Sequence, residues 1–167
     1  MADPAFRAAS QWARAIRAKK ISARELLDLY LDCIRRFNPT LNAVIALDLP
    51  AARKRAAAAD RALALGKVLG PLHGVPMTLK ESYDVQGLPS TWGLPALADN
   101  RPAENAVVAQ RFLDAGAVVF GKTNVPLMLA DFQSYNEVYG TTNNPWDETR
   151  GFPAARRAAA RRRSRPA

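Results

Sequence analysis

Apolar residues recur at helical spacing through the first part of the chain. Alanine, tryptophan and isoleucine positions within residues 5–20 predict an amphipathic helix, with Trp12 and Ile16 facing the core. A second, alanine-rich run over residues 50–65 predicts another helix, and Gly66 is a typical stop signal for it.

A capping box marks the start of a further helix between these two. Ser22 opens the sequence SARE, and Glu25 stands three residues later, so we expect a helix over residues 23–37. Asn38 and Pro39 are expected to end it. The apolar stripe of this helix consists of Leu26, Leu27, Tyr30, Leu31 and Ile34.

Short apolar runs alternate with the helices. Residues 42–47, 77–79 and 117–120 are predicted strands, and residues 104–114 are a predicted helix ended by Gly116. The residues of that helix expected to face inward are Val107, Val108, Phe112 and Leu113. This alternation predicts an α/β fold, with a sheet covered by helices on both faces.

Two stretches lack a sustained apolar period. Residues 81–103 are rich in proline and glycine and are expected to form a long structured loop, a type of segment that is often functional. Residues 133–147 are polar, turn-rich and aromatic, and we interpret them as an ordered loop or pocket wall.

Composition indicates a soluble globular protein of ordinary domain size. The chain has 167 residues, of which 49% are hydrophobic and 23% charged. It contains no apolar run near the roughly 20 residues that cross a bilayer, and its N-terminus lacks the apolar block of a secretory signal. We therefore expect a cytoplasmic protein that does not bind membranes.

The net charge of +9 resides mostly in the last residues. Residues 151–167 contain six arginines and no acid, and the rest of the chain has 18 basic against 15 acidic residues. Arginine-rich segments of this kind are normally disordered. The tail could be an RNA-binding arm, but it has little aromatic interleaving and the body offers no basic patch, so nucleic acid is not the expected partner.

Few residues could bind a metal or form a disulfide. The single cysteine, Cys33, excludes an internal disulfide, and its apolar helical setting favours a buried thiol over a nucleophile. With His73 as the only histidine, a site built from His and Cys has too few ligands. We expect no metal and no cofactor.

Lys80 is the candidate catalytic residue. The sequence GPLHGVPMTLKES places it at the end of a short apolar run bounded by prolines and glycines. On a strand, Thr78 and Lys80 share one face, so the ammonium group could be held against apolar packing, and burial would make such a lysine a base. The alternative is a solvated lysine at a strand end.

Three blocks in the same order resemble the N-terminal third of the amidase signature family. They are GPLHGVPMTLKESYDVQGLPSTWG, DAGAVVFGKTNVP and QSYNEVYGTTNNPWDETR. The resemblance covers most of residues 20–150 and implies the α/β/α fold of that family, a mixed sheet flanked by helices, which is incomplete here. It also implies hydrolysis of amide bonds by a Ser, cis-Ser and Lys triad.

Within this resemblance, Lys80 matches the catalytic lysine of the GVPxxxK motif, which favours the base over the solvated lysine. The neutral amine would accept a proton relayed from the nucleophilic serine through the cis-serine. Many family members have aspartate directly after the lysine, where this chain has Glu81. That departure leaves the assignment of the lysine intact.

The nucleophile and the cis-serine of the family are absent from this chain. In the family, the block ending in DxTR runs into PGGSSGGS, whereas here an arginine and alanine tail follows Arg150. The codons of Phe152 to Pro166 can also be read in a shifted frame, in which each new codon begins at the third base of a codon of this chain. If that base is chosen freely each time, the shifted frame can encode PGGSSGGSAAALAAG. We therefore expect residues 1–150 to be the N-terminal part of an amidase domain, and residues 151–167 to be a disordered, out-of-frame tail that a frameshift created.

The resulting expectation is a truncated amidase whose intact relative hydrolyses a small-molecule carboxamide to a carboxylate and ammonia or an amine. The chain alone is expected to be inactive and to fold poorly, because a partial sheet exposes strand edges. One alternative is the A subunit of a tRNA-dependent glutamine amidotransferase. Another is a small basic RNA-binding protein that uses its tail. The sequence determines neither the amide substrate nor the oligomeric state.

Overall fold

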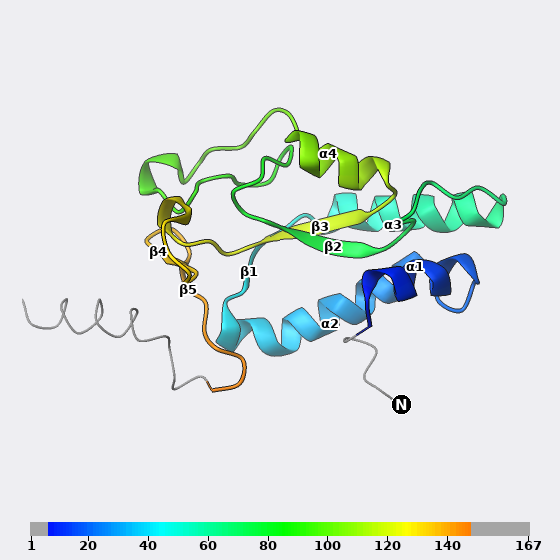
Figure 1. Ribbon diagram of the computed structural model, residues 1–167, viewed down its shortest axis with the longest axis horizontal. Helices are drawn as coiled ribbons and strands as arrows, with labels where there is room; N and C mark the ends of the chain where they lie inside the picture. The colour runs from blue at the N-terminus through cyan, green and yellow to red at the C-terminus, as the bar shows by residue number, and fades with distance from the viewer. Residues whose placement is uncertain (1–6, 148–167) are drawn as a thin grey trace, which may run out of the picture.

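A small mixed sheet lies at the centre of the computed structural model, which describes residues 7–147 (Figure 1). The helices are α1 (Ala9–Arg17), α2 (Ala23–Leu41), α3 (Leu49–Ala64), α4 (Val107–Asp114) and the short 3-10 turns η2 (Pro95–Leu97) and η3 (Leu127–Leu129). The strands are β1 (Val44–Leu47), β2 (Pro76–Lys80), β3 (Val118–Thr123), β4 (Tyr135–Asn136) and β5 (Gly140–Thr141).

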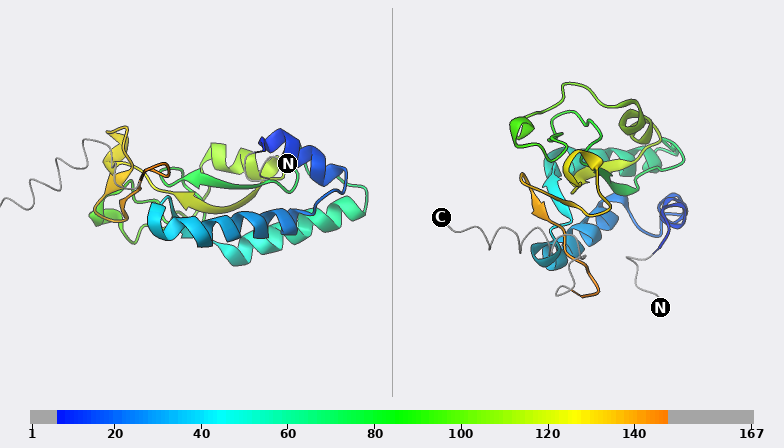
Figure 2. Two further views of the ribbon diagram at one scale, coloured as in Figure 1. Left: turned by 90° about the horizontal axis from the view of Figure 1, so that it is seen from below. Right: turned by 60° about the vertical axis from the view of Figure 1, so that its left-hand side comes forward.

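The sheet has the strand order β1-β3-β2, with β3 antiparallel to β1 and parallel to β2. Helices α2 and α3 lie along one face, and α4 covers the other (Figures 1 and 2). This arrangement confirms the predicted α/β class, with a mixed sheet between helices.

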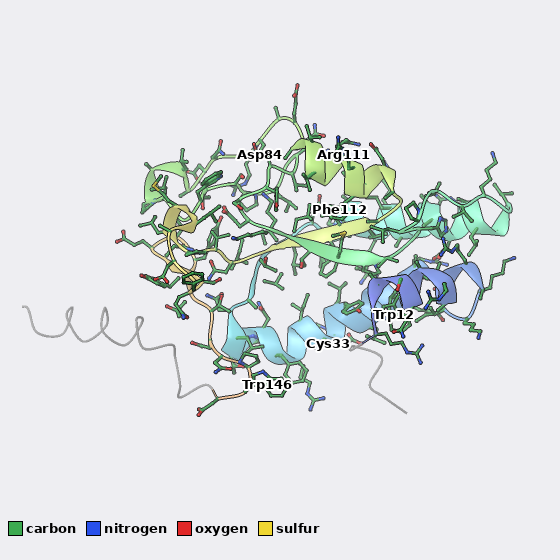
Figure 3. The ribbon with its side chains drawn as sticks, in the orientation of Figure 1. Trp12, Cys33, Asp84, Arg111, Phe112 and Trp146 are labelled. Carbon is green, nitrogen blue, oxygen red and sulfur yellow. The ribbon has the colours of Figure 1, made fainter. Side chains whose placement is uncertain are left out.

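Side chains alternate along β3 and supply a core on each face of the sheet. Val118 and Phe120 pack against α2 and α3, while Val119 packs with Leu79 and α4 on the other face. Phe112 descends from α4 toward the sheet (Figure 3). The alternation therefore fixes which face of β3 each helix covers.

The buried face of α1 and the start of α2 are as the sequence predicts. Trp12 and Ile16 of α1 are buried, and the indole N–H of Trp12 donates a hydrogen bond to the hydroxyl of Tyr30 at 3.0 Å. The capping box at the start of α2 is present, because the Glu25 amide donates to the Ser22 hydroxyl and the Ser22 amide donates to the Glu25 carboxylate.

The predicted end of α2 is wrong, because the helix continues through Asn38 and Pro39 to Leu41. Asn42 ends it in the left-handed conformation, with φ 52°, and donates its amide to the Asn38 carbonyl at 2.7 Å. The Asn38 side chain accepts the next free amides, those of residues 43 and 44. These bonds fix the last turn of the helix, although Pro39 has no amide to donate.

The prediction that Val107 and Val108 face inward is also wrong, since both are exposed. Helix α4 begins only at Val107, and it contacts the sheet through Ala109, Phe112 and Leu113. Successive residues of a helix are rotated by about 100°. Val108 therefore lies on the flank of that contact face, and Val107 lies opposite it.

The two stretches without apolar period are ordered, as expected. Residues 81–103 contain only the turn η2, and residues 133–147 contain the hairpin of β4 and β5. The hairpin lies at the end of the sheet where β2 and β3 finish (Figure 1). In the part of the chain that the structure describes, no helix is both long and apolar enough to cross a membrane.

Candidate functional site

Lys80 is the last residue of β2 and pairs with Thr123 at the end of the parallel strand β3. Its side chain is exposed, so the expectation that apolar packing would enclose the ammonium group is wrong. Thr78, on the same face of β2, is only half-buried. Lys80 thus stands where the carboxyl ends of two parallel strands meet, a common place for functional residues.

Glu81, the next residue, is fully buried and has both its carboxylate oxygens engaged. One oxygen accepts hydrogen bonds from the Thr91 amide and, at 3.1 Å, from the Tyr139 hydroxyl. The other oxygen accepts the Trp92 amide at 3.0 Å. The carboxylate therefore connects the end of β2 to the long loop and to the β4–β5 hairpin.

Lys122 of β3 is the second buried charged residue of the site. Its ammonium group donates to the carbonyl oxygens of Pro89, at 2.6 Å, and Glu81, at 3.1 Å. Burial lowers the pKa of Lys122 to about 8, and the carboxylates of Glu81 and Asp84 oppose that shift. Lys122 is therefore the lysine of this site whose pKa is strongly shifted by its surroundings.

An irregularity in the sheet explains why the burial of Lys122 could not be read from the sequence. In strict alternation, Lys122 would share the face of Val118 and Phe120. The register between β2 and β3 shifts between Met77 and Thr78, as in a β-bulge, and Lys122 pairs with Leu79 beyond the shift. It consequently reaches the loop that follows β2. The one available signal was a lysine separated from a buried apolar run by a single glycine, Gly121.

Asparagine side chains fasten the β4–β5 hairpin to the end of the sheet. Asn42 donates to the Tyr139 carbonyl at 2.7 Å, and Asn124 donates to the Gly140 carbonyl at 3.1 Å. Asn136 donates to the Asn124 side chain at 2.9 Å. These amide groups satisfy backbone carbonyls that would otherwise lie unpaired between the hairpin and the sheet.

The loop beside the hairpin has a strained backbone. Trp92 has φ 54°, an uncommon value for a non-glycine residue, and its carbonyl accepts the amide of Met128, which has φ 49°. Gly93 follows, and a Cβ atom there would lie 2.6 Å from the Cβ of Asn136. Strained residues of this kind are concentrated at functional sites.

The remaining candidates lie elsewhere. Cys33 is half-buried on α2 (Figure 3), and His73 is fully buried in the turn before β2. Burial lowers the pKa of His73. Within residues 7–147, no group of three His, Cys, Asp or Glu side chains could hold a metal ion. The expected loss of the serine motif and the disordered tail at 151–167 lie outside the described residues.

The arrangement places one exposed amine at a strand end whose backbone is fixed by two buried charges. An amine in that place can accept a proton from, or donate a hydrogen bond to, a group bound above the strand ends. Lys80, the residue that the sequence singled out, provides the amine. Glu81, which the sequence marked only as a departure from the family's aspartate, and Lys122, which was not a predicted site residue, provide the support.

Comparison with known proteins gives consistent matches. The family model described as Amidase matches residues 25–153. The chain is 38% identical over 150 residues to the A subunit of the glutamyl-tRNA(Gln) amidotransferase from Acidothermus cellulolyticus, a match that covers 90% of this chain and 30% of that protein. It is 44% identical over 135 residues to indoleacetamide hydrolase of Bradyrhizobium diazoefficiens, covering 81% of this chain and 26% of that protein.

The solved structures agree. A bacterial aryl acylamidase of the amidase signature enzymes superposes with a TM-score of 0.80 at 31% sequence identity. The superposition covers 85% of this chain and 30% of that one. The chain therefore spans about 30% of the length of the relatives that it matches, and its fold is partial relative to theirs.

Proposed function

Because the chain belongs to the amidase family, we propose that it is the lysine-bearing part of a hydrolase that converts a carboxamide to a carboxylate and ammonia or an amine. The observation that carries this proposal is the place of Lys80. The last five residues of GVPMTLK form β2, and the lysine stands at the strand end, beside the parallel strand β3. Relatives that hydrolyse amides match the chain over this segment.

In the proposed chemistry, the Lys80 amine accepts a proton that a cis-serine relays from the nucleophilic serine. A lysine base of this kind needs an environment that excludes water. The exposed Lys80 side chain would acquire one only when further polypeptide covers the strand end. A lysine without nucleophile, relay serine and oxyanion donors also lacks acyl-transfer catalysis, since one oxyanion donor alone contributes roughly 10²- to 10³-fold in rate. The chain by itself is therefore inactive in this proposal.

A frameshift near codon 150 is part of the proposal. It is supported by the shifted reading of the codons of Phe152 to Pro166, which, with the first base of each shifted codon chosen freely, can encode PGGSSGGSAAALAAG, a sequence that begins with the family motif PGGSSGGS. Sequencing the gene across codon 150 tests this directly. If no frame reads GGSSGGS after the codon of Arg150, the frameshift is excluded.

The activity test compares two proteins. The 167-residue chain is assayed on simple aliphatic and aromatic amides, with ammonia or amine release as the readout, and no hydrolysis above background is expected. If the gene carries the serine motif in another frame, one base is added or removed to restore that frame. The resulting protein should hydrolyse amides, and Lys80→Met should abolish the reaction while Lys67→Met should not. Lysine-dependent hydrolysis by the 167-residue chain would contradict the inactivity proposed here.

A second candidate is the A subunit of a tRNA-dependent glutamine amidotransferase. The observation that favours it is the match to a protein of that kind over 90% of the chain. This function predicts release of ammonia from glutamine and assembly with other proteins. The frame-restored protein distinguishes the two: glutamine hydrolysis only with a co-purifying partner supports the amidotransferase, and partner-free hydrolysis of other amides supports the amidase.

A further inference from the structure

Two charged side chains are completely buried at the end of the sheet, and they are the only buried Asp, Glu, Lys or Arg side chains within residues 7–147. They are Lys122 of β3 and Glu81, the residue after β2. Burying a charge is unfavourable unless it is paired and hydrogen-bonded. The pair therefore requires an explanation beyond packing, since apolar residues could fill the same volume.

The backbone amide and carbonyl of Glu81 are both hydrogen-bonded, as its carboxylate is. Its amide donates to the Thr123 carbonyl at 3.0 Å, which continues the pairing of β2 with β3. Its carbonyl accepts the Lys122 ammonium group at 3.1 Å and the Ser90 hydroxyl at 3.3 Å. Every polar group of the residue that follows Lys80 is thus bound to another segment of the chain.

These bonds converge on one peptide from three directions. Lys122 comes from the neighbouring strand, the Thr91 and Trp92 amides come from the long loop, and the Tyr139 hydroxyl comes from the hairpin. Successive side chains of a strand point to opposite sides. A buried, immobile Glu81 side chain therefore directs the Lys80 side chain outward, on the open side of the strand end.

We propose that Glu81 and Lys122 are positioning residues for Lys80: the buried pair fixes the strand end so that the Lys80 amine is held in one place for proton transfer. This inference rests on the proposed function of Lys80. It assigns to Lys122, a lysine that contacts no substrate in this proposal, the role of holding the peptide on which the base depends. It also gives the glutamate after the lysine a definite task, which is to tie the loop and the hairpin to β2.

Charge is part of the support. Burial lowers the pKa of Lys122 to about 8, and the other charges that face it are the carboxylates of Glu81 and Asp84 and the guanidinium group of Arg101. The Tyr139 hydroxyl faces the Glu81 carboxylate. Because the lowered pKa means that the folded chain favours the neutral amine, loss of the proton does not weaken the fold, and the amine can still donate to the Pro89 and Glu81 carbonyls. It does remove a positive charge beside the peptide that follows Lys80, so the surroundings of the Lys80 side chain should change as the pH rises through the pKa of Lys122.

The test follows the Lys80 side chain in the full 167-residue chain with ¹³C-labelled lysine ε-methylene groups, observed by NMR from neutral to alkaline pH. In the wild-type chain, the Lys80 signal should show a step near pH 8 that coincides with the titration of Lys122. Lys122→Met should remove that step. Lys67→Met, which changes an exposed lysine in the turn after α3, is the matched control and should leave it unchanged.

Amide hydrogen exchange at neutral pH provides a second readout. Glu81→Gln keeps the size of the side chain but removes its charge and one acceptor, so at least one of the Thr91 and Trp92 amides, which bond different oxygens of Glu81, should exchange about tenfold faster. Amides within α2 and α3 should keep their protection, which shows that the fold is intact. Equal protection of Thr91 and Trp92 in the variant and the wild type would overturn the proposal.

The wild-type titration is decisive if a variant does not fold. If the chemical shift of the Lys80 signal does not change as Lys122 titrates in the wild-type chain, the positioning role is overturned without any substitution. These measurements do not involve amide hydrolysis. If the activity assay showed that Lys80 is not the base, the step and the exchange rates would be unaffected, so failure of the function and failure of the positioning role remain distinguishable.

Discussion

The hydroxyl of Tyr139 donates a hydrogen bond of 3.1 Å to the buried carboxylate of Glu81, 58 residues earlier in the chain. This bond joins the β4–β5 hairpin to the strand end that carries Lys80. Together with the asparagine bonds, it holds in place a hairpin of only two short strands. Its paired residues alone could not stabilise it, because isolated hairpins are marginal in water.

Tyr139→Phe should therefore lower the free energy of unfolding by about 1–2 kcal/mol, since it removes one hydrogen bond to a buried carboxylate. Urea unfolding followed by circular dichroism measures the change. Tyr135→Phe is the matched control, because the Tyr135 hydroxyl bonds Asp131 in a more exposed place, and its effect should stay below about 0.5 kcal/mol. Equal losses in the two variants would contradict a special role of the Tyr139 bond.

His73 should make the fold sensitive to mild acid. Burial lowers the pKa of this imidazole from its ordinary value of 6.5. The unfolded chain therefore binds a proton as the pH falls through 6.5, whereas the folded chain still resists it, and stability decreases below that pH. The Nδ1 atom accepts the Leu69 amide at 3.0 Å, which further favours the neutral ring.

His73→Asn tests this prediction, because the amide oxygen can replace Nδ1 as acceptor and does not titrate. The free energy of unfolding of the wild type should fall more steeply between about pH 7 and pH 5 than that of the variant. Urea titrations at several pH values give both slopes. If the slopes are the same, the acid sensitivity comes from other groups, and His73 does not contribute.

Much of the layout could be predicted from local pattern. The capping box of Ser22 and Glu25 and the burial of Trp12 and Ile16 depend on residues that are close in sequence, and all are present. The errors at Pro39 and Val108 are also local. In each case, a neighbouring residue took the expected role. Asn42 ended α2 instead of Asn38, and Ala109 occupied the contact face of α4 instead of Val108.

The candidate site could be predicted only in part, for a physical reason. The motif around Lys80 identified the strand and its end, but the exposure of Lys80 depends on what lies above that end. The burial of Lys122 depends on a register shift between β2 and β3, two strands that lie far apart in the sequence. Hydrogen bonds such as that from Tyr139 to Glu81 link distant segments, and no local pattern encodes them.

Gly121 should tolerate no side chain, because β1 passes directly beside it. A Cβ atom at this position would overlap the carbonyl oxygen of Ala46. Gly121→Ala should cost about 3 kcal/mol or more in the free energy of unfolding, since backbone must move to make room. Gly87→Ala is a useful control: its φ of 81° is unfavourable for alanine, but the space around it is open, so about 1 kcal/mol is expected. Urea unfolding of both variants should preserve this order.

The outer edges of β1 and β2 should make the chain self-associate. Within residues 7–147, the central sheet ends at these two strands, and unpaired strand edges invite pairing with other chains. Sedimentation velocity should show larger species as the concentration rises. Leu47→Lys, which adds a charge at an exposed apolar position of β1, should reduce them. A monomer at every concentration, with sharp two-state unfolding, would contradict the expectation of poor folding.

The two lysines at the end of the sheet should separate stability from chemistry. Lys80 is exposed, so Lys80→Met should change the free energy of unfolding of this chain by no more than about 0.5 kcal/mol. Lys122 is buried, and Lys122→Met leaves the carbonyl oxygens of Pro89 and Glu81 without the ammonium group that donates to them. Leaving buried acceptors without a donor costs about 1–3 kcal/mol. Urea unfolding of both variants at neutral pH measures the contrast. If Lys80→Met proved as destabilising as Lys122→Met, the Lys80 side chain would have a structural role, and its exposed place at the strand end would no longer support its assignment as the base.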